Sequence, residues 1–374
     1  MRNEYGANYE VYWPNDIKCN GFIDKNPDNF IVKETFGDII INCNNPSRNI
    51  RFGMGHKYLY LTLVKRGIST FDCVNAIADM LNINKSAITY CGLKDTLATA
   101  TQRISIDLSV YKKSTISFEG ANKSSFYLCN PELSDTPLHV GQHTGNNFTI
   151  KVNTTNPEAT LRKMSQLIRK LKTNKIPNFY GPQRFGPNRS NHEIGKEIIK
   201  GNFKKAAEMW LSSQNILYAD SSTTINATQI ATFKSNVQMY GDYAAAFEAI
   251  DLGPFFIRAY HSYLFNKVLA SIIGTIQLEK LETVGFDTKF STETELIYNE
   301  VLDDENIAIS EFNLPNHPKL SIRGGYRNTM FVPQNLGLKA NRDSVTLSFT
   351  LPKAAYASVF LGFILKDNSK FDWI

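Results

Sequence analysis

Residues 90–104, YCGLKDTLATATQRI, contain the features that decide how this part of the chain folds. Apolar and β-branched residues lead into the stretch and alternate again from Ile104, which predicts two strands joined by a short loop. Gly92 interrupts the first strand and allows a tight turn. Asp95 lies in the loop, where a scaffold often carries its catalytic groups. We therefore consider Asp95 a candidate catalytic carboxylate, with Lys94 beside it as a cation that would keep it ionised.

The residues alone leave a second interpretation of this loop open. Asp95 is then an ordinary turn residue, because aspartate side chains bond readily to nearby backbone N–H groups. Lys94 is then a solvated surface charge.

A comparison of motifs gives the first interpretation more weight. The sequence GLKD at 92–95, followed by Ala98 and Gln102, resembles the signature of the TruD family of pseudouridine synthases. That signature reads G-x-K-D, a basic residue, x-A, and a Val-Thr pair before Gln. Thr96 departs from it where the family usually has Lys or Arg, and Ala100 departs where it usually has Thr. The resemblance implies that the aspartate of the motif is the catalytic residue and that Lys94 and Gln102 line the substrate site.

A second motif lies at 177–186, where PNFYGPQRFG resembles the family's P-N-Y-F-G-x-Q-R-F-G. The two differ in the order of Phe179 and Tyr180. Glycine and proline restrict the loop, and Arg184 offers a planar cation that suits phosphate or carboxylate. We therefore expect Arg184 to contact the substrate.

A loop and an alternating strand follow at 145–152, GNNFTIKV, and resemble the family's G-N-x-F-x-I segment. The resemblance implies that Asn146 and Phe148 line the active site and that the ring of Phe148 stacks on the target base. The residues alone also allow Phe148 to be a core residue of the strand.

The turn before Phe30 resembles the family's D-F-x-V-x-E segment, which usually has a lysine six residues before the Phe. This chain has Asp24 at that position and Lys25 one residue later. We expect Lys25 to contact the substrate or to keep Asp95 ionised, and a solvated turn lysine is the alternative.

The bulk composition restricts the class of protein. The chain has 374 residues, 42% of them hydrophobic, which is enough for two domains or one large discontinuous domain. No apolar run approaches the roughly 18 residues of a membrane span, and the N-terminal residues lack the apolar segment of a secretory signal. The net charge of +6 favours a polyanionic partner only slightly.

The five cysteines are scattered, without a C-x-x-C pair. We therefore expect neither a structural zinc site nor a disulfide framework, and a reducing compartment fits this pattern. His139 and His143 have a metal-ligand spacing, but they lie in a glycine-containing loop without an acidic partner, so no metal is predicted there. The cysteines are Cys19, Cys43, Cys73, Cys91 and Cys129.

The motif matches extend from residue 22 to residue 358, and their family implies an α+β fold. A pseudouridine-synthase catalytic domain with a bent antiparallel sheet is expected at 1–182 and 336–374, and an inserted TRUD-type α+β domain at 183–335. The implied function is that of an RNA pseudouridine synthase, an isomerase that changes a uridine of tRNA, at position thirteen, to pseudouridine. We expect a monomer that binds RNA, uses no cofactor, and acts inside the cell, in the cytoplasm or, in a eukaryote, the nucleus.

Two other classes of function stay open at this point. A catalytically weak or inactive RNA-binding or chaperone protein could retain the fold, and the departures at Asp24, Thr96 and Ala100 favour it. A protein-binding α+β scaffold would require both motifs to arise by chance.

Overall fold

The computed structural model describes residues 19–365 apart from 44, 48, 53–54, 112–114, 118–124, 172–174, 187, 218–223 and 251. The parts of the expected catalytic domain at 1–18 and 366–374 lie outside this range. The described chain divides into two compact units, one at 19–175 and 331–365 and the other at 176–330. These boundaries lie close to the ends expected for the insert, 183 and 335. The assignment of a catalytic and a TRUD-type domain to the two units stays a prediction.

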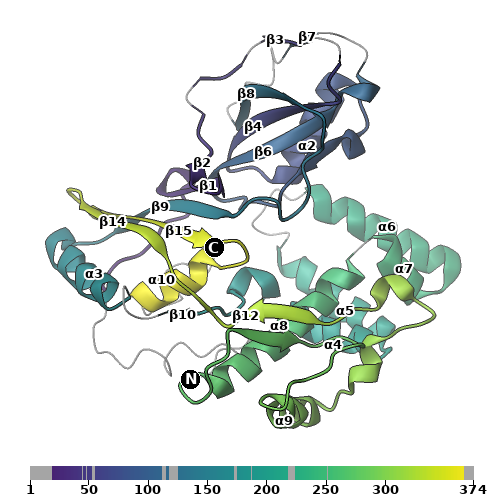
Figure 1. The fold of residues 1–374 in the computed structure, drawn as a ribbon. Coiled ribbons are helices and arrows are strands. Elements are labelled where there is room, and N and C mark those ends of the chain that lie inside the picture. The colour runs from purple at the N-terminus through teal and green to yellow at the C-terminus, as the bar shows by residue number, and fades with distance from the viewer. Residues whose placement is uncertain are drawn as a thin grey trace. The chain divides into compact units, whose positions relative to one another are not determined.

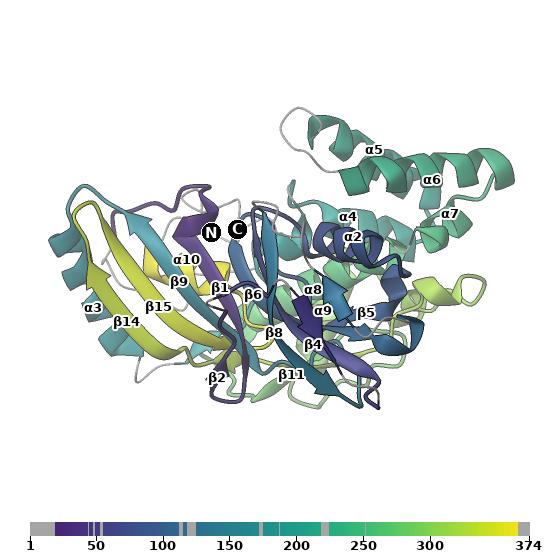
Figure 2. The ribbon, with the colours of Figure 1, turned by 90° about the horizontal axis from the view of Figure 1, so that it is seen from above.

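The first unit is built on a curved mixed sheet with the order β14-β15-β9-β1-β6-β4-β8, to which β2 adds beside β1 and β5 beside β6 (Figures 1 and 2). All its pairs are antiparallel except β1 with β6. The expected α+β fold around an antiparallel sheet is thus confirmed, with one parallel pair at its centre. The strands are β1 (Phe30–Phe36), β2 (Ile39–Ile40), β4 (Tyr58–Arg66), β5 (Ile88–Tyr90), β6 (Thr99–Asp107), β8 (Phe126–Ser134), β9 (Gly145–Asn153), β14 (Gln334–Ala340) and β15 (Ser344–Pro352).

Helix α2 (Thr70–Leu81) covers the sheet at β4 and β6. Ser69 caps the start of the helix, because its hydroxyl accepts a hydrogen bond from the Asp72 N–H at 3.0 Å. Its apolar residues recur at helical spacing and pack on Leu61, Leu63 and Ile104. The buried residues of the helix are Thr70, Cys73, Val74, Ile77, Ala78 and Leu81.

Two further helices belong to the other end of this sheet, near β14 and β15 (Figure 1). They are α3 (Pro157–Leu171) and the apolar α10 (Ala357–Leu365). The ring of Phe360 in α10 packs edge-on against Phe349 of β15, with centroids 4.5 Å apart. The short strands β3 (Asn49–Arg51) and β7 (Thr115–Ser117) pair with each other.

The second unit is largely helical. Its long helix α8 (Gly253–Ile272) packs closely on α4 (Asn191–Ile199), because Gly195 lets the backbone of α4 approach the Phe256 carbonyl. The remaining elements are η4 (Pro182–Phe185), α5 (Phe203–Leu217), α6 (Thr224–Tyr240), α7 (Tyr243–Ala249), α9 (Glu295–Glu305), η5 (Ile309–Phe312), η6 (Pro318–Leu320), β10 (Ile176–Pro177), β11 (Lys280–Thr283), β12 (Gly325–Asn328) and β13 (Met330–Phe331), which crosses the boundary.

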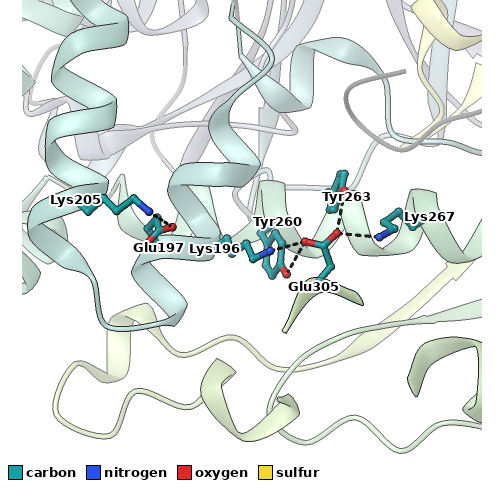
Figure 3. Close-up of polar contacts among 7 residues, drawn as sticks. All are labelled: Lys196, Glu197, Lys205, Tyr260, Tyr263, Lys267 and Glu305. Carbon is teal, nitrogen blue, oxygen red and sulfur yellow. Dashed lines mark hydrogen bonds and ion pairs between the residues drawn. The ribbon is translucent and has the colours of Figure 1, made fainter. Parts of the chain in front are cut away.

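One carboxylate joins three helices of this unit. Glu305, the last residue of α9, forms ion pairs with Lys196 of α4 and Lys267 of α8, whose Nζ atoms lie 2.7 and 2.9 Å from its carboxylate oxygens (Figure 3). The hydroxyls of Tyr263 and Tyr260 also donate to it, at 3.0 and 3.4 Å. Four donors satisfy the two carboxylate oxygens, so this group can lie largely buried without an unpaired charge.

The sequence of α9 carries no clear helical signal. Residues 281–330 are rich in polar side chains, yet Glu295–Glu305 forms a helix whose buried side chains are Tyr298, Val301 and Leu302. These three residues are too few to give a clear apolar period among the surrounding charges. Packing of the helix against α8 and the bonds of Glu305 provide what the local pattern lacks.

The expectation of no disulfide is wrong for one pair of cysteines. Cys43 and Cys129 are bonded, with Cα atoms 6.2 Å apart and a sequence separation of 86. Asn130 donates its side-chain amide to the carbonyl of Asn42 at 2.6 Å, so the same two segments also meet through a hydrogen bond. Sequence spacing could not reveal this proximity, because the fold alone brings the segments together. The cysteines at 19, 73 and 91 are buried and form no disulfide with another described residue.

Helices that could cross a lipid bilayer would have to be long and apolar, and the part of the chain described here contains none.

Candidate active site

The register of the central strands places several polar side chains on one face of the sheet. Directly opposite residues of neighbouring strands point to the same side, as do residues two apart in one strand. Pairing joins Glu34 to Asn146 and Leu63 to Gln102, while Ala100 lies opposite both Val32 and Lys65. Phe148 lies opposite Val32. The shared face therefore carries Glu34, Lys65, Gln102, Asn146 and Phe148.

This is also the face on which α2 and α10 pack. Leu63 and Ile104 point to the same side of the sheet as Gln102, and both pack with α2. Phe349 lies opposite Phe148 and contacts Phe360 of α10. Glu34 and Asn146 thus lie on β1 and β9, between the strands that the two helices cover, while Lys65 and Gln102 lie on β4 and β6, beside α2.

The loop between β5 and β6, which carries Asp95, is held from this face. Gln102 is fully buried and donates its amide to the carbonyl of Gly92 at 3.2 Å. Thr70, at the start of α2, donates to the Gln102 side-chain oxygen at 3.0 Å and accepts from the N–H of Lys94 at 3.2 Å. Gln102 is predicted from sequence to contact the substrate; its observed bonds position the loop.

Lys94 forms a buried ion pair with Glu34, in which Nζ lies 3.0 Å from Oε1 and the side chains are 5% and 0% exposed. The second carboxylate oxygen accepts from the N–H of Arg103 at 2.8 Å. Burial raises the pKa of Glu34, and the attraction of Lys94 opposes this only in part. The ammonium that we expect to hold Asp95 ionised therefore has Glu34 as its ion-pair partner, and a direct role of Lys94 toward the substrate stays a prediction.

A different lysine lies against Asp95. Lys65 of β4 is fully buried, and its Nζ donates to the backbone carbonyls of Asp95 at 2.5 Å and Ile68 at 2.8 Å. Burial lowers the pKa of Lys65 to about 8, although the negative charge of Asp95 acts in the opposite direction. The motifs do not point to Lys65, which follows the largely apolar run at 58–64 as a single charged residue. The signal that could have found it is the strand period itself, which directs every second residue inward.

Lys25 is exposed in a loop, and no described residue forms an ion pair or hydrogen bond with it. Asp24, which stands at the family's lysine position, instead accepts from the Asn29 side chain at 2.7 Å and stabilises the turn. A contact of Lys25 with the substrate stays a prediction.

Phe148 is 4% exposed and part of an aromatic stack. Its ring lies 5.1 Å from that of Phe349 at an interplanar angle of 21°, and 6.0 Å from Phe30 in an edge-on contact. In this structure Phe148 is therefore a core residue, which is one of the two interpretations that the sequence allows. Stacking on a base, implied by the resemblance, stays a prediction.

Four side-chain atoms of this unit are shielded from solvent and have no hydrogen-bond partner among the described residues: Asn146 Oδ1, His143 Nδ1, Ser358 Oγ and Glu34 Oε1, which has only its ion pair with Lys94. Burial, with help from Lys94 and Lys353, lowers the pKa of His143 to about 4, so the ring is neutral at pH 7. Buried polar atoms are rarely left without a partner. A polar ligand could supply the missing partners.

Arg184 belongs to the second unit. Its Nε donates to the Ser262 hydroxyl at 3.0 Å, and its guanidinium carbon lies 5.7 Å from the centre of the Tyr180 ring. Arg327 lies on the same ring at 3.9 Å and bonds to Asn178, which fixes the PNFYGPQRFG loop. Contact of Arg184 with the substrate stays a prediction.

No three His, Cys, Asp or Glu side chains converge as a metal site would require in the ranges described.

Comparisons with known proteins agree with the resemblance seen in the motifs. The sequence model of the TruD family, tRNA pseudouridine synthase D, matches residues 7–235 and 278–362 of this chain. A Picrophilus torridus protein named probable tRNA pseudouridine synthase D is 27% identical over 93% of this chain and 94% of its own. A protein of the same name from Methanosarcina acetivorans is 25% identical over 100% of this chain and 97% of its own.

A crystal structure shows the same fold. It is that of a candidate tRNA pseudouridine synthase D from Methanosarcina mazei, which superposes with a TM-score of 0.65 at 22% identity and covers 99% of each chain.

Proposed function

Because this chain belongs to the TruD family of tRNA pseudouridine synthases, which are isomerases, we propose that it converts the uridine at position thirteen of a tRNA to pseudouridine with Asp95 as its catalytic carboxylate. The reaction breaks the N1–C1′ bond, turns the uracil and joins C5 to C1′, while the hydrogen leaves C5 and N1 gains a proton. One carboxylate suffices, either by attacking C1′ and leaving again when C5 bonds to C1′, or by stabilising a cationic sugar, removing the C2′ proton and returning it once the base has turned.

The observation that carries this proposal is the contact of buried Lys65 with the Asp95 backbone. A carboxylate must be ionised to act as a nucleophile or base, and a nearby ammonium favours the ionised form. The loop that presents Asp95 is also fixed by Gln102 and Thr70. A reacting group fixed in this way loses little entropy on reaching the sugar.

The target base must leave its stack before the carboxylate can reach C1′. Phe148 provides an aromatic surface for the base, and the unpartnered Oδ1 of Asn146 can accept a hydrogen bond from the N3–H of uracil. Phe148 is buried at present, so the base reaches its ring only if the surrounding side chains move.

The test uses purified protein and an unmodified tRNA transcript that carries tritium at C5 of uridine. Wild type is expected to release tritium, and cyanoethylation with mass spectrometry is expected to map the product to position thirteen. Asp95→Asn is expected to bind the transcript within a few-fold and to form no product. Thr96→Ser, in the same loop, is the control and is expected to retain the rate. Product from purified Asp95→Asn would refute the assignment.

An RNA-binding protein without catalysis is the rival function, favoured by the departures at Asp24, Thr96 and Ala100. Ala100 is fully buried opposite Val32 and Lys65, so its side chain belongs to the packing of the sheet. The departure there is therefore a weak argument against catalysis. RNA binding without tritium release in the wild type would favour the rival.

A further inference from the structure

One face of α8 presents two polar side chains and an arginine outside the proposed catalytic unit. Arg258, His261 and Ser262 are spaced i, i+3 and i+4, so they lie side by side on the helix surface. The Ser262 hydroxyl donates to the Arg258 carbonyl at 2.7 Å, which holds it within this row. Arg258 is exposed, and Ser262 is buried.

Arg184 reaches the same row from η4. Its Nε bond to Ser262 uses one of its five N–H groups, and the Tyr180 ring supports its plane. Its terminal nitrogens form no hydrogen bond or ion pair with the residues that the structure describes, and the same holds for Arg258. The Arg184 guanidinium thus lies beside the Ser262 hydroxyl, and neither Arg184 nor Arg258 has an acidic partner in the described chain.

His261 adds a buried group without a partner. Its Nε2 is shielded from solvent and has no hydrogen bond within the described ranges. Burial, together with the positive charges of Arg184, Arg258 and Arg327, lowers the pKa of His261 to about 3. The ring is therefore neutral, and positive charge surrounds it. An anion at this point would attract the arginines and could accept a hydrogen bond from the imidazole N–H.

We propose that Arg184, Arg258 and His261 form a binding site for a backbone phosphate of the RNA substrate. Guanidinium groups bind phosphate oxygens through paired N–H donors, and a neutral imidazole adds a third donor. This site deepens the proposed function and rests on it, because a tRNA substrate is what supplies the phosphate. Its role is to hold the RNA, without a part in the bond rearrangement.

The test measures the dissociation constant for an unmodified tRNA transcript at a series of salt concentrations. Arg258→Ala removes an exposed cation, and Lys204→Ala, an exposed lysine of α5 in the same unit, is the matched control. Arg258→Ala is expected to weaken binding several-fold and to reduce the slope of log affinity against log salt by about 0.7–0.9, as the loss of one phosphate contact does. Lys204→Ala is expected to change neither quantity.

A second variant keeps the charge of the site and removes only the imidazole. His261→Phe is expected to weaken binding without a change in the salt slope. Thermal unfolding shows whether either variant disturbs the fold. Arg258→Ala should leave the melting temperature unchanged, because Arg258 is exposed. If the wild type forms pseudouridine but Arg258→Ala binds with wild-type affinity and slope, the phosphate site is wrong and the function stands. If the wild type neither binds tRNA nor forms product, the function itself fails.

Discussion

Nζ of Lys65 lies 2.5 Å from the backbone carbonyl oxygen of Asp95, inside the sheet face that also carries Glu34 and Gln102. A buried ammonium needs hydrogen-bond acceptors and a nearby negative charge, because burial otherwise strongly favours its neutral form. Here two carbonyls accept from it and the Asp95 carboxylate attracts it. The lysine and the proposed catalytic aspartate therefore stabilise each other's charge.

Lys65 should determine how the reaction rate falls at high pH. Burial lowers its pKa to about 8, so the ammonium loses its charge as the pH rises through 8, and Asp95 then loses its cation. The single-turnover rate of the wild type is expected to decline above about pH 8. Lys65→Arg should retain activity at higher pH because a guanidinium stays protonated. Lys65→Met should lose roughly ten- to a hundredfold in rate at pH 7, and its rate should not decline further above pH 8. If the rate declined at the same pH in the wild type and in Lys65→Arg, this role of Lys65 would be contradicted.

Phe148 and Phe349 allow the base platform to be separated from core packing. Both rings belong to one stack, and both are buried, so Phe148→Leu and Phe349→Leu should destabilise the fold by similar amounts, about 1–2 kcal/mol. If Phe148 supports the base, Phe148→Leu should also lower the rate at saturating tRNA tenfold or more, while Phe349→Leu should not. Equal rates for the two variants, at matched stability, would leave Phe148 with its core role alone.

The sequence predicted the strands around Asp95 because glycine and alternating residues are local signals. Helix α2 likewise has local signals, because Ser69 caps its start and its buried apolar residues recur at helical spacing. The sequence could not assign Lys94 to Glu34, since that pair forms only when β1 and β6 lie side by side. Lys65 was missed for a related reason: its inward direction follows from the strand period, but its contact with Asp95 depends on how the loop folds back. The pairing of Cys43 with Cys129 likewise requires the fold.

Removal of one partner of the Glu34–Lys94 pair should destabilise the first unit more than removal of both. Lys94→Met leaves a buried carboxylate with one backbone N–H as its described hydrogen-bond partner, at a cost of about 3–5 kcal/mol in the free energy of unfolding. The double variant Glu34→Gln with Lys94→Met removes both charges and should recover part of that loss. Chemical denaturation of the wild type, the single variants and the double variant measures the coupling. Additive effects would show that the two charges do not depend on each other.

Glu305 should make the stability of the second unit sensitive to acid. Burial raises its pKa, but the hydrogen bonds from Lys196 and Lys267 outweigh this and lower the pKa to about 2 (Figure 3). Because the folded pKa lies below the unfolded value of about 4.3, the contribution is complete above that value and is lost as the pH falls toward 2. It amounts to about 2–3 kcal/mol. Glu305→Gln should therefore lower stability at pH 7 and show little further loss between pH 4.5 and 2.5. Glu197, whose ion pair with Lys205 is more exposed, provides the control: Glu197→Gln should cost less than 1 kcal/mol. An acid transition that is unchanged in Glu305→Gln would rule out Glu305 as its source.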